Sequence, residues 1–208
     1  MRVLLIRHGE TDWNASQRYQ GHGAMPLNAR GRAQAHALAQ RLGVRGPFAA
    51  LVSSDLPRAM ETAAILGSAL GLAPQHHAGL REIDVGEWAG LTPSDVRQRL
   101  PDHWVAYARD PANTPRQGGE SYAQVQRRAV AALAELVAAG DGPIALVSHG
   151  GTIRALLCHV LGLDLARIDH LWIDNCAICE LRLRHDRWRV VRINDAAHLE
   201  GSALADGE

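Results

Sequence analysis

The sequence predicts an α/β domain with a mostly parallel sheet. Short, continuous apolar runs at residues 3–6, 50–52 and 144–147 have the length and composition of strands that are covered on both faces. Stretches with helical periodicity lie between these runs, and glycines follow them. Strand and helix therefore alternate along the chain, which is typical of parallel sheets with helical crossovers.

Four amphipathic helices are expected, because apolar residues recur three and four positions apart. The candidate N-cap of the first helix is Asn28, and each stripe is followed by a glycine that can stop it. The stripes cover residues 35–42, 59–70, 125–136 and 153–161, and the glycines are Gly43, Gly71, Gly140 and Gly162.

Two further segments complete the predicted domain. Residues 177–183 and 187–193 alternate arginine with apolar side chains, which predicts a pair of strands at the edge of the sheet. Residues 100–119 are rich in proline, glycine and polar side chains, and they predict a short helix followed by a loop. We expect one domain over residues 1–208, with a lid inserted at about 92–119.

The composition argues against two classes of protein. The 208 residues include 22 Lys plus Arg and 22 Asp plus Glu, whereas a nucleic-acid-binding protein usually has a basic excess. No apolar run reaches the length of a membrane span. Lysine is absent, and arginine is the better ligand for oxyanions, although a GC-rich genome would favour the same residue. We expect a cytoplasmic protein, because the first residues lack the pattern of a secretory signal.

The three cysteines do not predict a disulfide framework, since their number is odd. Cys176 and Cys179 form a CxxC pattern near a predicted strand. Residues three apart in a strand point to opposite faces, so neither a redox pair nor a metal site is favoured. We expect both to be buried as small apolar residues.

Two predicted strands end in the same dipeptide, His-Gly. His8 follows Arg7 at the end of the first strand, and His149 follows the strand at 144–147. Ligands bind outside the carboxyl ends of strands in open α/β sheets, so both imidazoles are expected to face one cleft. A third strand end is followed by Arg58, and the guanidinium groups of Arg7 and Arg58 suit a phosphate oxyanion.

A loop with three acidic residues contains the candidate proton donors. They are Glu82, Asp84 and Glu87, and the pattern alone does not separate them. Two imidazoles and a carboxylate can also bind Zn²⁺. The positive charge of the arginine beside His8 argues against that alternative, because it repels a second cation.

Four blocks of sequence therefore share one predicted edge of the sheet, and their letters can be compared with known families. They read RHGET at 7–11 with YQG at 19–21, SSDLPRAMETA at 53–63, LREIDVGEWAG at 80–90 and VSHGG at 147–151. This ordered series resembles the histidine phosphatase superfamily, in its phosphoglycerate-mutase-like branch. The resemblance implies a three-layer α/β/α fold and phosphoryl transfer that needs neither a metal nor an organic cofactor.

The resemblance also implies a role for each matching residue. His8 is the implied nucleophile and Glu82 the implied proton donor. The residues implied in phosphate binding are Arg7, Asn14, Gln20, Gly21, Arg58, His149 and Gly150. The chemistry calls for a neutral His8 whose second nitrogen donates to a backbone carbonyl, and for a protonated His149 that adds positive charge.

We expect a phosphatase that hydrolyses small phosphomonoesters. The alternative is a phosphoglycerate mutase primed by 2,3-bisphosphoglycerate, but such mutases usually have a threonine at the position of Gln20 and a longer insertion before the second histidine. A non-catalytic binder of phosphorylated ligands is the alternative from another class, and it has no need of a nucleophile and an acid. Sugar phosphates, phosphoglycerate-type acids and α-ribazole phosphate are candidate substrates, and a homodimer is compatible with the sequence.

Overall fold

The computed structural model describes residues 1–200 and Leu204, and its sheet has the strand order β3-β2-β4-β1-β5-β6. The strands are β1 (Arg2–Arg7), β2 (Ala50–Ser53), β3 (Gln75–His76), β4 (Ile144–Ser148), β5 (Ile178–Arg184) and β6 (Arg187–Asp195). β1, β2, β3 and β4 run parallel to one another, and β5 pairs antiparallel with both β1 and β6 at one edge. The predicted mostly parallel sheet and its edge hairpin are therefore confirmed.

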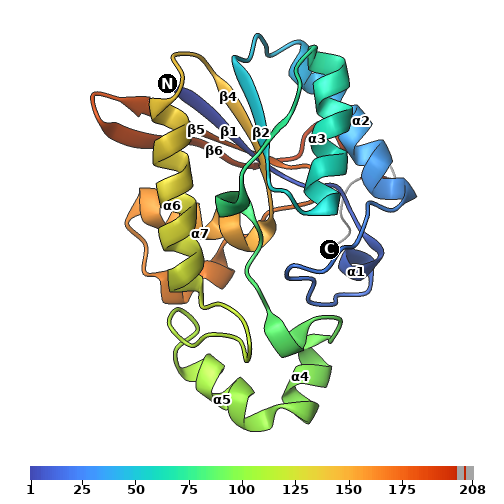
Figure 1. Ribbon diagram of the computed structural model, residues 1–208, viewed down its shortest axis with the longest axis vertical. Helices are drawn as coiled ribbons and strands as arrows, with labels where there is room; N and C mark the ends of the chain where they lie inside the picture. Colours follow the sequence, from blue (N-terminus) through green and yellow to red (C-terminus); the bar gives the residue numbers. More distant parts are fainter. Residues whose placement is uncertain (201–203, 205–208) are drawn as a thin grey trace.

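The main helices cover both faces of this sheet, as Figure 1 shows. Helices α2 (Ala29–Gly43) and α3 (Pro57–Leu70) lie on one face, and α6 (Tyr122–Ala138) and α7 (Gly150–Leu161) lie on the other. The structure is thus the predicted three-layer α/β/α sandwich. Among the described residues, no helix is long and apolar enough to cross a membrane.

Alternation along the central strands explains the two cores. Val3 and Leu5 of β1 pack with α6 and α7, whereas Leu4 and Ile6 pack with α2 and α3. All four side chains are buried completely. Because successive strand residues point to opposite faces, a continuous apolar run is what a strand between two helical layers requires.

Capping residues set most helix boundaries where the sequence predicts them. The Asn28 side chain accepts from the Gly31 N–H at the start of α2. Gly71 and Gly162 end α3 and α7 in the left-handed conformation, with φ of 67° and 65°. Gly43 is different, because it is the last residue of α2 and the cap is Val44 in right-handed geometry. The helix therefore ends at Gly43 as predicted, but not through a left-handed glycine cap.

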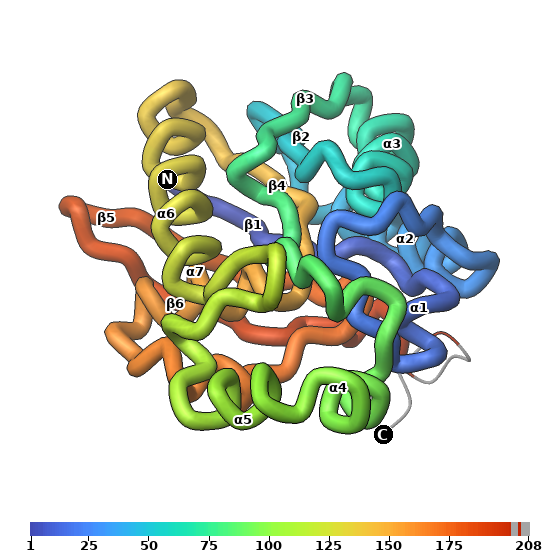
Figure 2. The backbone as a smooth tube through the Cα atoms, turned by 60° about the horizontal axis from the view of Figure 1, so that its bottom comes forward, coloured from blue at the N-terminus to red at the C-terminus, as the bar shows by residue number. Residues whose placement is uncertain are grey.

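The segment after the acidic loop forms two short helices, α4 (Pro93–Arg99) and α5 (Pro101–Arg109). A capping box of Thr92 and Asp95 starts α4, and the predicted helix-plus-loop at 100–119 is present as α5 and the turn after it. Both views place α4 and α5 together at one end of the molecule (Figure 1 and Figure 2). A third apolar cluster, which includes Trp88 and Val96, attaches this end to α6 and α7.

The cysteines are buried free thiols, as expected. Cys179 lies in β5, but Cys176 precedes the strand in a turn, with φ of 58°. The argument from opposite strand faces therefore does not apply to Cys176, because the chain turns there and its N–H donates to the carbonyl oxygens of Arg7 and His8. This turn brings the segment before β5 against the carboxyl end of β1.

Candidate active site

His8 and His149 lie side by side at the carboxyl ends of neighbouring strands. β1 and β4 pair in parallel with Arg7 opposite Ser148, and the N–H of His8 donates to the Ser148 carbonyl at 3.0 Å. The two imidazole centroids are 5.1 Å apart, and both side chains are buried. The predicted convergence of the two His-Gly units on one edge of the sheet is what the structure shows.

The hydrogen bonds of His8 define its tautomer. Nδ1 lies 2.7 Å from the carbonyl oxygen of Gly9, which only accepts, so Nδ1 carries the proton. Nε2 accepts from Nε of Arg58 at 3.1 Å and therefore holds a lone pair. Burial, and next the nearby positive charges of Arg58 and Arg7, hold the pKa of His8 well below its usual value. The ring is neutral near pH 7, and its unprotonated nitrogen faces Arg58.

Arg58 is held rigidly at the start of α3. Its Nη1 donates to the Gly23 carbonyl at 3.0 Å and its Nη2 to the Gly21 carbonyl at 2.8 Å. The side chain is buried, and burial lowers its pKa to about 10. The guanidinium remains charged near neutral pH and is aimed at His8 by two backbone carbonyls.

Arg7 lies beside the same edge. Its Nη1 donates to the Ile173 carbonyl at 2.6 Å. A Cβ on Gly150, the first residue of α7, would lie 3.5 Å from Nε of Arg7, so this helix start is close to the guanidinium. The positive end of the helix dipole and Arg7 therefore favour an anion at the same place.

His149 is a neutral ring in this arrangement. Its Nε2 is 2.8 Å from the Ser54 hydroxyl, and burial, followed by the charge of Arg58, keeps its pKa well below the usual value. Without a bound anion, His149 therefore differs from the expected protonated ring, because the lack of solvent and the charge of the buried Arg58 disfavour a further positive charge. His149 can still offer an N–H as a hydrogen-bond donor.

Of the three acidic candidates, only Glu82 shares a hollow with Arg7. This hollow has a volume of about 180 Å³, and its lining also includes Gly150 and Gly151. The carboxylate accepts from the backbone N–H groups of Ile83 at 2.9 Å and Gly151 at 3.1 Å. Asp84 instead accepts from the Gly86 N–H, and Glu87 is exposed. The geometry thus separates acids that the sequence pattern does not.

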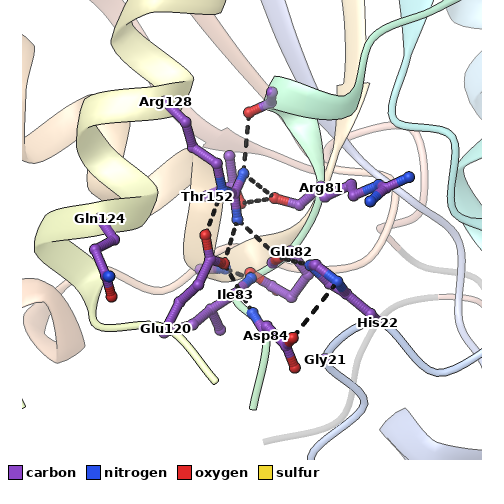
Figure 3. A network of polar contacts seen from close by, with 12 residues as sticks. Gly21, His22, Arg81, Glu82, Ile83, Asp84, Glu120, Gln124, Arg128 and Thr152 are labelled. Atoms are coloured by element: carbon purple, nitrogen blue, oxygen red, sulfur yellow. Dashed lines mark hydrogen bonds and ion pairs between the residues drawn. The ribbon is translucent and has the colours of Figure 1, made fainter. Parts of the chain in front are cut away.

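Arg128 of α6 fixes the loop that carries Glu82, as Figure 3 shows. Its Nη1 donates to the Arg81 carbonyl at 2.7 Å, and its Nη2 donates to the Glu82 carbonyl at 2.8 Å. Glu120 binds Nε and Nη2 of Arg128 at 2.9 Å each. The Thr152 hydroxyl also donates to the Arg81 carbonyl, at 2.7 Å. One guanidinium therefore ties helix α6, Glu120 and the acidic loop together.

Three more residues that the resemblance implies in phosphate binding, Asn14, Gln20 and Gly21, each make a different contact near the site. Asn14 lines a hollow with Arg7, and its Oδ1 accepts from the Thr11 N–H at 3.1 Å. Gln20 is buried, and its Oε1 accepts from the Thr11 hydroxyl at 3.0 Å. Gly21 contributes its carbonyl to Arg58, so it contacts the site through the arginine.

Two polar residues in the site escaped the sequence analysis. Ser54 contacts His149, and its position after β2 is a strand end like those of His8 and His149, so the same rule could have found it. Asn175 donates from Nδ2 to the His8 carbonyl at 2.9 Å. It belongs to an irregular segment before β5, which carries no comparable sequence signal. Within residues 1–200, no three His, Cys, Asp or Glu side chains are grouped as metal ligands would be.

A neutral imidazole, two arginines and a neighbouring carboxylate lie together at the carboxyl edge of an α/β sheet, an arrangement that suits phosphoryl transfer. Residues 3–196 match the model of the histidine phosphatase superfamily, branch 1, and the chain belongs to this family. The family expected from the motifs is therefore confirmed.

Several relatives carry phosphatase names. The chain is 40% identical over 174 residues to the glucosyl-3-phosphoglycerate phosphatase of Mycobacterium tuberculosis. The aligned region covers 79% of this chain and 77% of the relative. A solved structure of a mycobacterial glucosyl-3-phosphoglycerate phosphatase with VO3 superposes with a TM-score of 0.84 at 38% identity, covering 93% of this chain and 98% of that one. The expectation of a phosphomonoester hydrolase is confirmed at this level.

Another relative carries a mutase name. The chain is 35% identical over 216 residues to a protein of Yersinia enterocolitica named probable phosphoglycerate mutase GpmB, covering 98% of this chain and 97% of the relative. Similarity alone therefore connects the chain with both names.

Proposed function

We propose that the protein hydrolyses phosphomonoesters of small molecules through a covalent phosphohistidine at His8. The observation that carries this proposal is the pairing of His8 with Arg58. Nδ1 is protonated against Gly9, so Nε2 carries the lone pair for attack, and the Arg58 guanidinium, which a bound phosphate can draw away, lies 3.1 Å from that nitrogen. A nucleophile and a cation for phosphate oxygens thus occupy one place, as phosphoryl transfer requires.

In the first proposed step, Nε2 of His8 attacks phosphorus and the bond from phosphorus to the ester oxygen breaks. The leaving oxygen takes the electron pair and accepts a proton from Glu82. In the second step, water gives a proton to the Glu82 carboxylate and attacks phosphorus, and the phosphorus–nitrogen bond breaks with its electron pair returning to Nε2. Arg7 and Arg58 stabilise the charge on the equatorial oxygens in both steps.

The other phosphate-binding roles are proposed from proximity. Asn14 and the backbone at Gln20 and Gly21 line the phosphate position, and Gly150 offers the N–H at the start of α7. His149 donates a hydrogen bond as a neutral ring. This proposal is supported by the short distance between the two imidazoles and by the buried position of His149.

The proposed substrates are small, because the hollow that contains Glu82 measures about 180 Å³. Phosphorylated sugar acids and phosphoserine are reasonable substrates, since relatives of this chain are named glucosyl-3-phosphoglycerate phosphatase and phosphoserine phosphatase 1. The mutase name of the Yersinia relative supports isomerisation of phosphoglycerate as a second candidate. A mutase must return the phosphoryl group from His8 to a second substrate before water reaches it.

A phosphate-release screen tests these alternatives directly. The protein is incubated with a panel of phosphomonoesters in the presence of EDTA, and 3-phosphoglycerate isomerisation is followed in parallel with 2,3-bisphosphoglycerate as primer. The proposal expects phosphate release that EDTA does not reduce, and turnover well above the rate of isomerisation. Isomerisation faster than hydrolysis would favour the mutase, and activity restored only by Zn²⁺ would favour a metal enzyme.

Three broader proposals accompany this function. The segment with α4 and α5 is proposed to act as a lid within a single domain, supported by its position beyond the main helical layers (Figure 1).

A cytoplasmic location is proposed, and the three buried free thiols support it. We also propose a homodimer, because Val191 and Ile193 are exposed on the edge strand β6, where a second copy could pair. Sedimentation analysis measures the oligomeric state.

A further inference from the structure

The imidazole of His149 has one nitrogen with a hydrogen-bond partner and one without. Nε2 lies 2.8 Å from Oγ of Ser54, whereas Nδ1 is buried and has no partner among the described residues. Buried polar atoms of folded proteins nearly always have a partner, so an unpartnered nitrogen calls for an explanation. The ring is next to that of His8, with 5.1 Å between the centroids, and therefore adjoins the place where the phosphate would bind.

The hydroxyl of Ser54 is held in place by the backbone around it. Ser54 follows β2, and its N–H donates at 2.9 Å to the carbonyl of Val147, which lies two residues before His149. Its Oγ accepts at 3.3 Å from the N–H of Leu56, the N-cap residue of α3. Both Ser54 and His149 are completely buried. The geometry of their contact is therefore set by the sheet and by the start of α3.

A count of donors and acceptors decides between the two tautomers of the neutral His149 ring. The Leu56 N–H occupies one lone pair of Ser54 Oγ, and within the described residues His149 is the only other partner of this oxygen. A serine hydroxyl has one hydrogen to donate. If Nε2 carried the imidazole proton, that hydroxyl hydrogen would be buried without an acceptor, which costs free energy. The hydroxyl therefore donates to Nε2, and the imidazole proton lies on Nδ1.

We propose that Ser54 is a positioning residue, which holds His149 in the Nδ1-protonated tautomer so that Nδ1–H donates to a phosphate oxygen. The unpartnered donor is then satisfied when phosphate binds beside His8. The other tautomer would present a lone pair to the phosphate oxygens, which repel it. In His8 the Gly9 carbonyl fixes the tautomer that presents a lone pair, and in His149 the Ser54 hydroxyl fixes the one that presents a proton. This inference rests on the proposed function and adds a residue that acts through His149.

The position of the proton is measured without turnover, by long-range ¹H–¹⁵N NMR of the imidazole rings near neutral pH. The signals of His149 are assigned by their loss in His149→Asn. The wild type should show a protonated Nδ1 and an unprotonated Nε2. Ser54→Ala should populate the other tautomer, because nothing then donates to Nε2, whereas Ser54→Thr keeps the hydroxyl and should keep the wild-type signals. Ser53→Ala is the matched control, because the buried Ser53 hydroxyl donates to the Ser54 carbonyl and not to His149.

The affinity for inorganic phosphate, measured by titration calorimetry, tests the consequence for binding. Ser54→Ala should weaken phosphate binding about tenfold, the loss of one hydrogen bond to a charged ligand. Ser54→Thr and Ser53→Ala should retain the wild-type affinity. Should Ser54→Ala not fold, Ser54→Cys gives the same comparison, because a thiol is a weaker donor than a hydroxyl.

The outcomes separate this role of Ser54 from the proposed function. A proton on Nε2 in the wild type, or a proton confined to Nδ1 in Ser54→Ala, would overturn the role of Ser54, whatever the activity. Unchanged phosphate affinity in a variant with the altered tautomer would overturn the contact between Nδ1 and phosphate. Absence of phosphate release from every ester, with the expected NMR signals, would contradict the proposed function alone.

Discussion

Nε of Arg58 donates to Nε2 of His8 at 3.1 Å, so the resting protein holds a cation directly against the nitrogen that the mechanism uses. The contact keeps the imidazole neutral, because a second positive charge there would be repelled. A bound phosphate can take over the guanidinium as its ligand and so release the lone pair of Nε2. In the proposed mechanism, the same arginine would keep His8 neutral before binding and neutralise phosphate charge afterwards.

The buried neutral histidines should make the fold sensitive to acid. Burial holds the pKa of His8 and of His149 well below the usual value, so the folded chain takes up fewer protons than the unfolded chain once the pH falls below about 6.5. The free energy of unfolding should therefore decrease with falling pH, by about 2.7 kcal/mol per pH unit for two such groups. His198, with a pKa of about 4, acts in the same direction.

Urea unfolding at several pH values between about 5 and 7 measures this slope. His149→Asn should reduce it by about 1.4 kcal/mol per pH unit, the contribution of one histidine. His185→Asn is the matched control, because His185 is exposed in the β5–β6 turn and should leave the slope unaltered. A wild-type stability that stays constant from pH 7 to about 5 would show that these rings titrate normally in the folded chain.

Glu82→Gln should lower kcat by about 10²–10⁴-fold with little effect on KM, because the amide cannot protonate the leaving oxygen. Steady-state kinetics on the best substrate measures the split between kcat and KM. Asp84→Asn and Glu87→Gln are the controls, since neither side chain shares the hollow of Arg7, and both should remain within a few-fold of wild type. If Asp84→Asn were the slow variant instead, the acid would have been assigned to the wrong carboxylate.

Gly151→Ala should displace the acid without removing it. A Cβ at this position would lie 2.5 Å from Oε1 of Glu82 and 3.2 Å from Cε1 of Tyr122. Since misplacement of about 1 Å can cost 10²-fold in rate, we expect a loss of about that size in kcat. Gly140→Ala is the control, because nothing lies within 4 Å of its added Cβ. Full activity of Gly151→Ala would mean that the position of Glu82 is unimportant for turnover.

Arg128→Ala should affect both the acidic loop and the fold. It removes the Arg128 hydrogen bonds to the carbonyls of Arg81 and Glu82 and leaves Glu120 without its guanidinium partner. We therefore expect kcat to fall about 10²-fold and the free energy of unfolding to fall by about 1–3 kcal/mol. Arg128→Lys should recover part of the activity and part of the stability, because a single ammonium group cannot make all the hydrogen bonds of the planar guanidinium. Steady-state kinetics and urea unfolding measure both effects. Arg127→Ala is the control, because Arg127 is an exposed neighbour on the same helix. Equal kcat and stability in the two alanine variants would contradict a positioning role for Arg128.

The sequence was sufficient to predict the sheet and the convergence of its strand ends. The continuous apolar runs of β1 and β4 require helices on both faces, and parallel pairing brings His8 and His149 to the same edge. Arg58 could be placed because Pro57 starts a helix directly after β2. These inferences depend on local patterns and on one general rule of α/β sheets.

The contributions of distant segments could not be predicted. Asn175 reaches the site only because the chain turns at Cys176 and pairs β5 with β1, and no local pattern marks that turn. Arg128 resembles an ordinary exposed helix charge in the sequence, but tertiary packing aims it at three backbone carbonyls. The neutrality of His149 likewise follows from burial beside Arg58, which the motif does not encode.

Detection of a phosphorylated His8 is the most direct test of the proposed mechanism. The protein is mixed with a ³²P-labelled phosphoester, quenched in base within one turnover, digested and mapped by mass spectrometry. We predict an acid-labile, base-stable phosphoryl group on the peptide that contains His8, and no label in His8→Ala. Label of equal intensity in His8→Ala, or phosphate release from wild type with no label at any time, would contradict the phosphohistidine intermediate.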